Sequence, residues 1–400
     1  MKDVIYGLLM KKFLSILLTA LLAAVSALGA TAQTADFGGV FPAIAGENGT
    51  TYVSLFDVII SDEWTPVWQE YISAVLGDDA APGETVIEIA SAEALAAVNE
   101  NLSGHYILTA DIDLGGAEWT PIGAFVPGGG EEGEVPDMTA AFTGTFDGQG
   151  HVISNLRIDQ PEAWTLGLFG CIANAEVGNS TLENAEVDGR LMIADVVGYA
   201  YCSKVHDVWL WGGKVTAHAG EMSAEGMYGG IVGAAMGSEI ANCSAEAAIV
   251  LPDGTANAGI VGGGLEGTNV INCTGTGSVT AGNNCYGLGG VSGCGFAAEQ
   301  FTDCVAEDVT ITAGEGCFWI GGITGYAGGY PLEELGMPVT VFTNCRALNV
   351  TVNAGEGVQG VGDIVGSGFY SDEMAAMGEP FDQPTRFELV SCEAEPAIAR

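Results

Sequence analysis

The sequence predicts an all-β protein, a right-handed parallel β-helix, with a small helical segment on its N-terminal side. A short motif recurs along most of the chain at periods that are typical of solenoids and propellers. The segments between the turns are short and alternate with period two, as strands do. The chain also has 61 Gly among 400 residues, which indicates many tight turns. A β-propeller is the alternative, although it usually needs four strands in each repeat.

Residues 1–32 are interpreted as a secretory signal. Lys11 and Lys12 precede an apolar run over 13–28, and Ala30-Thr31-Ala32 offers a small-residue cleavage site. An uncleaved membrane anchor is the alternative. No other stretch is apolar and long enough to span a bilayer, so we expect no transmembrane domain once the signal is removed.

Residues 33–85 are predicted to form a helical segment and a linker. Thr65 can cap a helix and Pro66 suits its first turn. The remaining chain, 86–400, is expected to be the repeat domain. A second short helix at about 91–102 lies directly before its first strand and is expected to cap its open end.

Two short elements define the repeat. The first is an apolar pair followed by Gly, or a close variant of it: Leu168-Phe169-Gly170, Val196-Val197-Gly198, Ile231-Val232-Gly233, Ile260-Val261-Gly262, Val291-Ser292-Gly293, Ile323-Thr324-Gly325 and Ile364-Val365-Gly366. The second is a polar residue before a small or apolar one, and its polar members are Asn155, Asn184, Asp207, Asn242, Asn272, Asp303 and Asn344. In a coil of stacked parallel strands these polar residues are expected to lie over one another as a structural ladder.

Cysteines occupy one repeat position directly after the ladder residue: Cys243, Cys273, Cys304, Cys345 and Cys392. Stacked side chains project parallel to one another, so we favour buried free thiols over disulfides. Cys285 and Cys317 are the best candidates for a disulfide, because both close a Gly/Asn-rich turn before the next repeat. Zinc is disfavoured because the chain has no Cys-x-x-Cys pair.

The first repeats carry an ordered set of motifs. They read YILTADIDL at 106–114, WTPIG at 119–123, FTGTFDGQGH at 142–151 and GLFG at 167–170. This set resembles bacterial secreted and surface proteins with GLUG-motif repeats. The resemblance implies a right-handed parallel β-helix over about residues 86–396 and an adhesin-like role at the cell surface or outside the cell. It implies no shared catalytic residues.

The composition excludes several classes of partner. The 51 acidic and 10 basic residues give a formal charge of −41, which repels nucleic acid and anionic membrane surfaces. No cofactor is expected, and the Gly-rich run 262–267 is interpreted as a turn because no helix follows it. Calcium stays open because an acidic surface attracts divalent cations. An EF-hand is excluded, since the loop that starts at Asp111 has Ile122 where Glu is needed.

A pair of tryptophans is the candidate ligand-binding site. If the residues between them point inward, Trp209 and Trp211 both face outward. The aligned repeats place Glu186 and Asp188 on one side of the pair and Glu246 on the other. Indoles beside carboxylates can stack on sugar rings and accept hydroxyl hydrogen bonds. The alternative is that inserted loops cover the indoles.

The sequence therefore predicts a secreted or surface-displayed, non-catalytic module that binds an extracellular glycan or protein. A polysaccharide-degrading hydrolase or lyase is one alternative. The few cations are scattered, which argues against a lyase, while a hydrolase would need only two suitably spaced carboxylates. A structural spacer within a larger surface protein is the other alternative.

Overall fold

A computed structural model describes residues 44–45, 51–52, 85–125, 138–220, 226–295, 299–328, 340–367, 387–396 and 398. The predicted signal at 1–32 and the helix predicted at Thr65-Pro66 lie outside the described residues. Within 33–85, two short strands are described, β1 (Ile44–Ala45) and β2 (Thr51–Tyr52), and they pair antiparallel. None of the helices in the described ranges has the length and apolar character needed to cross a membrane.

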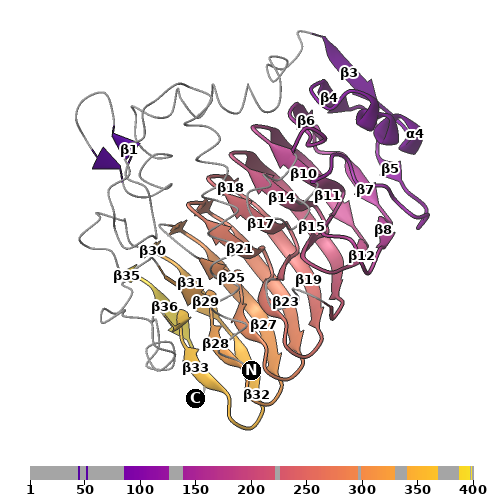
Figure 1. The fold of residues 1–400 in the computed structure, drawn as a ribbon. Helices are drawn as coiled ribbons and strands as arrows, with labels where there is room; N and C mark the ends of the chain where they lie inside the picture. The colour runs from indigo at the N-terminus through magenta and orange to yellow at the C-terminus, as the bar shows by residue number, and fades with distance from the viewer. Residues whose placement is uncertain are drawn as a thin grey trace.

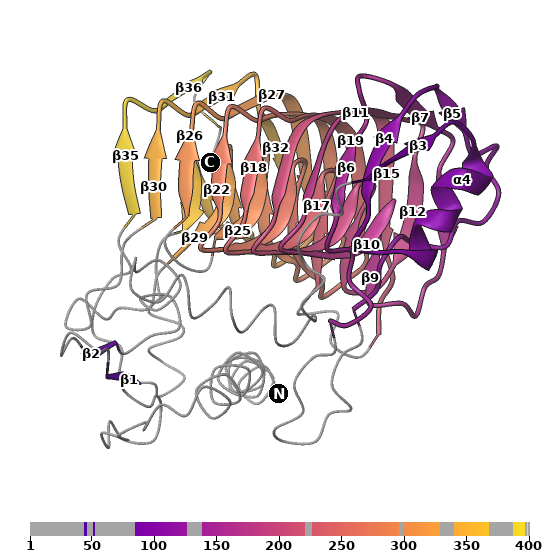
Figure 2. The same cartoon turned by 90° about the horizontal axis from the view of Figure 1, so that it is seen from above.

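The rest of the described chain is a parallel β-helix, which confirms the predicted fold class. Its strands pair in parallel and stack rung upon rung along one axis (Figures 1 and 2). Three sheets run along that axis, and we call them the long sheet and the first and second short sheets.

The long sheet has 20 strands. Its members in chain order are β3 (Val86–Ile89), β4 (His105–Leu108), β5 (Ile112–Asp113), β6 (Thr145–Asp147), β7 (Val152–Ser154), β8 (Arg157–Asp159), β11 (Glu176–Glu183), β12 (Glu186–Gly189), β15 (Lys204–Ala217), β18 (Glu239–Ala241), β19 (Ser244–Leu251), β22 (Asn269–Ile271), β23 (Thr274–Ala281), β26 (Gln300–Thr302), β27 (Val305–Ala313), β30 (Thr340–Thr343), β31 (Arg346–Leu348), β32 (Thr351–Ala354), β35 (Phe387–Val390) and β36 (Glu393–Glu395).

Each short sheet has seven strands. The first is made of β9 (Thr165–Leu166), β13 (Met192–Ala194), β16 (Met227–Gly229), β20 (Ala256–Gly259), β24 (Tyr286–Gly289), β28 (Phe318–Gly321) and β33 (Gln359–Gly362). The second is made of β10 (Phe169–Ala173), β14 (Val197–Tyr201), β17 (Val232–Met236), β21 (Gly262–Glu266), β25 (Ser292–Gly295), β29 (Thr324–Ala327) and β34 (Val365–Ser367).

A short helix covers the first rungs of the coil (Figure 2). It consists of α4 (Ala92–Ala96) and the 3-10 turn η2 (Ala97–Glu100). Ser91 caps it, because its hydroxyl accepts a hydrogen bond from the backbone N–H of Ala94 at 3.2 Å. Leu95 and Val98 are fully buried, so the helix closes the apolar interior at this end.

The interior is a stack of apolar and small side chains. Phe301 and Phe342 on adjacent rungs stack with ring centroids 4.7 Å apart. All ten cysteines of the chain are free thiols. Stacked cysteines in the interior donate to backbone carbonyls; Cys304 Sγ, for example, lies 3.3 Å from Val270 O. The apolar core is therefore continuous along the coil.

Cys285 and Cys317 do not form the disulfide for which the sequence made them candidates. Each thiol lies close to the carbonyl of a residue on the preceding turn. Cys285 Sγ is 3.2 Å from Pro252 O, and Cys317 Sγ is 3.1 Å from Gly282 O. The two thiols also lie within hydrogen-bonding reach of each other, and they do so as free thiols.

Two columns of turn residues with left-handed backbone replace the single ladder expected from the sequence. The first turn column contains Asn179, Asp207, Asn242, Asn272, Asp303 and Asn344, with φ between 51° and 54°. The second turn column contains Asn155, Asn184, Asp308 and Asn349. Within the first turn column, Asn272 Nδ2 donates to Asn242 Oδ1 at 3.0 Å, and Asn344 Nδ2 donates to Asp303 Oδ1 at 3.2 Å.

Asn155 and Asn184 were thus assigned to the wrong column. Strand β11 pairs Gly178 with His206, which places Asn179 and not Asn184 beside Asp207. Both turns need a residue that tolerates positive φ, and Asn meets that need at either one. The local chemistry of the two turns is therefore alike, and it does not reveal which Asn belongs to which turn.

Candidate functional site

Strand β15 carries the tryptophan pair on the outer surface of the long sheet. Val208 and Leu210 are fully buried, while Trp209 and Trp211 keep 38% and 43% of their surface exposed. The alternation follows directly from the period of two in a strand. Both indoles face outward, as predicted, and neither is buried.

The residues beside the indoles on the preceding rung differ from those predicted. Trp209 lies opposite Thr181, and Trp211 lies opposite Glu183. Glu186 and Asp188 are further along the sheet, where they pair with Lys214 and Thr216. The error has the same origin as the misplaced Asn184. The sequence alignment set Asn184 beside Asp207, whereas the structure sets Asn179 there, and this shift of five residues wrongly placed Glu186 and Asp188 beside the tryptophans.

On the following rung, the predicted neighbour Glu246 does lie close to the indoles. Trp209 lies opposite Ser244 in β19. The register then shifts between Leu210 and Gly213, and Gly212 adopts φ of 66°. This bulge leaves Glu246 facing the extra residues of β15 next to Trp211. Glu183 and Glu246 therefore flank Trp211 from its two neighbouring rungs.

A histidine that the sequence reasoning missed lies on the same face. His206 Nε2 is 2.9 Å from Glu176 Oε1, and His206 Nδ1 is 2.7 Å from Asp207 Oδ2. Gly178 lies opposite His206, and a Cβ on Gly178 would be 2.7 Å from the imidazole. The imidazole thus lies over the bare backbone of Gly178. Since both ring nitrogens face carboxylates, neither is directed at a nucleophile.

The lysines of this face are paired with carboxylates. Lys204 Nζ lies 3.3 Å from Glu239 Oε1. Lys214 Nζ lies 3.8 Å from Glu186 Oε1. These pairs are partly exposed and are worth little to stability, but they leave no uncompensated positive charge at either lysine.

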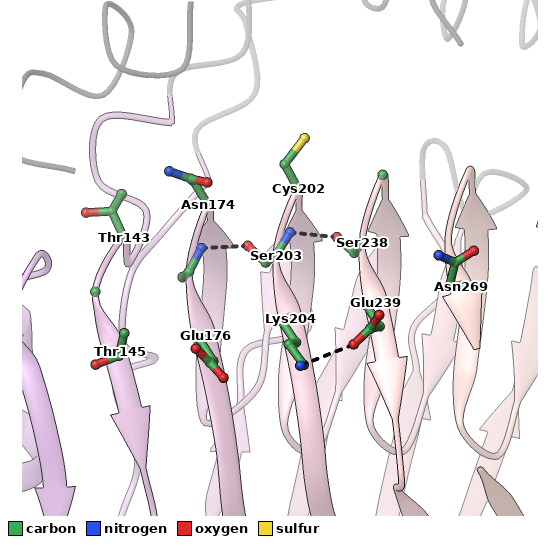
Figure 3. A pocket seen from close by; sticks show the side chains of 13 residues that line it. Thr143, Thr145, Asn174, Glu176, Cys202, Ser203, Lys204, Ser238, Glu239 and Asn269 are labelled. Atoms are coloured by element: carbon green, nitrogen blue, oxygen red, sulfur yellow. Dashed lines mark hydrogen bonds and ion pairs between the residues drawn. The ribbon is translucent and has the colours of Figure 1, made fainter. Parts of the chain in front are cut away.

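A shallow groove of about 430 Å³ opens where β15 begins (Figure 3). It is lined by Thr143, Gly144, Thr145, Asn174, Ala175, Glu176, Cys202, Ser203, Lys204, Gly237, Ser238, Glu239 and Asn269. Ser203 Oγ accepts from Ala175 N at 3.1 Å, and Ser238 Oγ accepts from Ser203 N at 3.0 Å. These serines hold the rungs together, so the groups that a ligand can meet include the amides, the lysine, the carboxylates and the thiol of Cys202.

The acidic turns near the N-terminal rungs are occupied by donors from the protein. Asp113 accepts hydrogen bonds from Asn155 Nδ2 at 2.7 Å and Gly115 N at 2.8 Å, which lower its pKa. Asp111 accepts from Val152 N at 3.0 Å, and this bond and His151 lower its pKa. Across the described ranges, no group of three or more His, Cys, Asp or Glu is arranged to hold a metal ion. Calcium binding therefore stays a prediction.

The family model of the GLUG motif matches residues 224–250. The match covers part of the rung that follows β15, and it lies outside the 106–170 stretch that carries the most specific motifs in the sequence. Halomucin of Haloquadratum walsbyi is 38% identical over 134 residues, which make up 32% of this chain and 1% of halomucin. The chain thus spans about 1% of the length of the curated relative it matches.

Two solved structures are similar at low identity. A candidate immunoglobulin A1 protease from Bacteroides ovatus has 17% identity and a TM-score of 0.49, over 78% of this chain and 85% of that one. A structure named IgA1 protease has 18% identity and a TM-score of 0.38, over 68% of this chain and 20% of that one. With its own strand stacking and the motif match together, the chain is a parallel β-helix that carries a GLUG motif.

Proposed function

We propose that this protein is an extracellular β-helix, secreted or displayed at a cell surface, that binds a glycan or protein ligand without catalysis. The predicted secretory signal and the similarity to halomucin support the location. The GLUG motif on a β-helix supports an adhesin-like role.

The observation that carries the binding role is the exposed tryptophan pair. The two indoles keep 38% and 43% of their surface exposed at neighbouring outward positions of β15, and burial of this apolar area by a ligand would be favourable. The surrounding strands place hydroxyls and carboxylates next to them, namely Thr181, Glu183 and Ser244. Aromatic faces rimmed by polar groups are the usual anchors of binding surfaces.

Binding measurements on the chain without residues 1–32 test this function. The protein should bind a component of a glycan array or a mucin layer, and Trp209→Ala combined with Trp211→Ala should abolish that binding. Leu389→Ala is the matched control, since Leu389 is an exposed apolar residue on the remote strand β35. Binding that survives the double substitution would contradict the role of this face.

The absence of catalysis is part of the proposal and has its own test. We expect no release of reducing ends from neutral or acidic polysaccharides. Activity that one Asp→Asn or Glu→Gln substitution removes would instead support the hydrolase alternative.

A further inference from the structure

We propose that the ligand of the β15 face is an uncharged glycan chain that lies along β15, from the groove at Lys204 to the indoles of Trp209 and Trp211. This inference rests on the proposed function and narrows it to one chemical class. Three features of the described residues carry it: the charge of the face, its hydrogen-bonding groups and its length.

The charge of the face disfavours anionic sugars. Its carboxylates outnumber its ammonium groups, and they are Glu176, Glu183, Glu186, Asp188, Glu239 and Glu246. Both lysines already face a carboxylate, Lys204 at 3.3 Å and Lys214 at 3.8 Å. A sulfate or uronate would have to displace these partners within a field set by a chain of formal charge −41.

The hydrogen-bonding groups of the groove suit hydroxyls. Asn174 and Asn269 offer amides that both donate and accept, Lys204 donates, and Glu176 and Glu239 accept. A sugar hydroxyl is both donor and acceptor, so it can bridge a lysine and a carboxylate on neighbouring rungs. A basic peptide could also pair with the carboxylates and place a cation over an indole. It is therefore the competing ligand that the test must distinguish from a glycan.

The length of the face calls for an extended ligand. Lys204 and Trp211 are seven residues apart in β15. At about 3.3 Å per residue an extended strand would span at most about 23 Å, and the left-handed turn at Asp207 shortens that distance. The indoles stand at alternate positions, about 7 Å apart along the strand. A single sugar cannot reach both the groove and the indoles, so affinity should rise with the number of sugar units.

Calorimetric titration of the chain without residues 1–32, in 150 mM NaCl, tests the inference. The neutral probes are cellohexaose, N-acetylchitohexaose and mannohexaose with their trisaccharides. The anionic probes are hexagalacturonate and a heparin hexasaccharide, and hexalysine is the basic peptide probe. We expect at least one neutral hexasaccharide to bind at least tenfold more tightly than its trisaccharide. The two anionic probes should not bind. The Trp209→Ala, Trp211→Ala variant should lose the binding, and Leu389→Ala should keep it.

The tryptophan double variant could lose binding simply because it misfolds, so a second variant that is expected to gain binding is also tested. Glu183→Lys with Glu246→Lys reverses the charge on both sides of Trp211 and should admit hexagalacturonate at the expense of the neutral ligand. If the unmodified protein binds an anionic glycan or a basic peptide through the indoles, the inference falls and the proposed function stands. If none of the glycans or peptides binds through the indoles, both fall.

Discussion

Asp195 is a buried carboxylate at the corner between β13 and β14. Its side chain is fully enclosed, and neither carboxylate oxygen has a hydrogen-bond partner among the described residues. A Cβ on Gly213, in the bulge next to Trp211, would lie 2.3 Å from Asp195 Oδ2. Burial raises the pKa of Asp195 well above its ordinary value, and the negative charge of Glu186 adds to the rise.

We expect Asp195→Asn to stabilise the protein at neutral pH. Since the folded pKa of Asp195 is raised, the folded state holds its proton over a pH range in which the unfolded chain has lost it. The free energy of unfolding therefore falls as pH rises above the ordinary Asp value of about 3.9. Relative to the unmodified protein, the variant should gain on the order of 1–3 kcal/mol at pH 8 and little at pH 4.

Thermal unfolding of both proteins at pH 4, 6 and 8 measures this difference. Comparing the two proteins at each pH cancels the titration of the many surface carboxylates. A difference that does not change with pH, or a loss of stability at pH 8, would contradict the assignment of Asp195 as a costly buried acid.

At the scale of turns and strands, the sequence predicted the architecture better than the register. Short alternating segments and recurring turns suffice to predict parallel stacking, because each rung must bury its apolar face on its neighbour. The register depends on which Asn occupies which turn, and Asn179 and Asn184 both fit a left-handed turn. Trp209 and Trp211 were still placed outward correctly, since outward or inward direction depends only on alternation along β15.

The register of the apolar-apolar-Gly motif was also predicted wrongly, at one of its copies. Val232 pairs with Gly262, and Gly262 pairs with Ser292. The frame of this copy is therefore Val261-Gly262-Gly263, one residue later than the sequence suggested. Three consecutive glycines at 262–264 satisfy the pattern in more than one frame, and only the pairing of neighbouring rungs decides between them.

The first turn column can be tested at Asn272. Asn272→Ala should destabilise the protein by about 1–2 kcal/mol, because Ala is strained at positive φ and the amide bond to Asn242 is lost. Asn272→Gly should cost less, since Gly adopts this φ freely. Asn353→Ala, on the exposed strand β32, is the control and should be close to neutral.

Chemical denaturation of the three variants gives the comparison. Equal losses for Ala and Gly at position 272 would mean that the backbone conformation contributes nothing. If Asn353→Ala destabilised the protein as much as Asn272→Ala, the first turn column would contribute no more to stability than an exposed strand position.

The stacked thiols make a further prediction. Eight of the ten cysteines are buried, and Cys202 and Cys392 are partly accessible. Burial raises the pKa of Cys202 to about 12, and it also raises the pKa of the less enclosed Cys392. A raised pKa slows the reaction because the thiolate is the nucleophile. In the native protein, Cys392 on the last rung should therefore react first with a maleimide reagent, and the buried thiols should react only after unfolding.

Mass spectrometry of peptides from briefly labelled protein identifies the modified residues. Labelling of Cys273 or Cys304 as fast as Cys392 would show that the interior is open to the reagent. That result would contradict a closed, continuously packed coil.

At the scale of the whole molecule, the formal charge of −41 opposes compaction. Added salt should raise the melting temperature, because it screens repulsion between carboxylates beyond about 10 Å at 0.1 M ionic strength. Calcium, magnesium and sodium chloride at equal ionic strength separate screening from specific binding. Equal stabilisation by calcium and magnesium would indicate screening by divalent ions alone, whereas a larger effect of calcium would support the calcium prediction.

Hydrogen–deuterium exchange with and without a bound neutral hexasaccharide tests most directly whether the β15 face is the binding surface. We predict slower exchange confined to β15 and to the neighbouring residues 174–183 and 237–248, with no change on the two short sheets. Protection concentrated on the short sheets or on the terminal rungs, with β15 unchanged, would contradict the proposed binding surface.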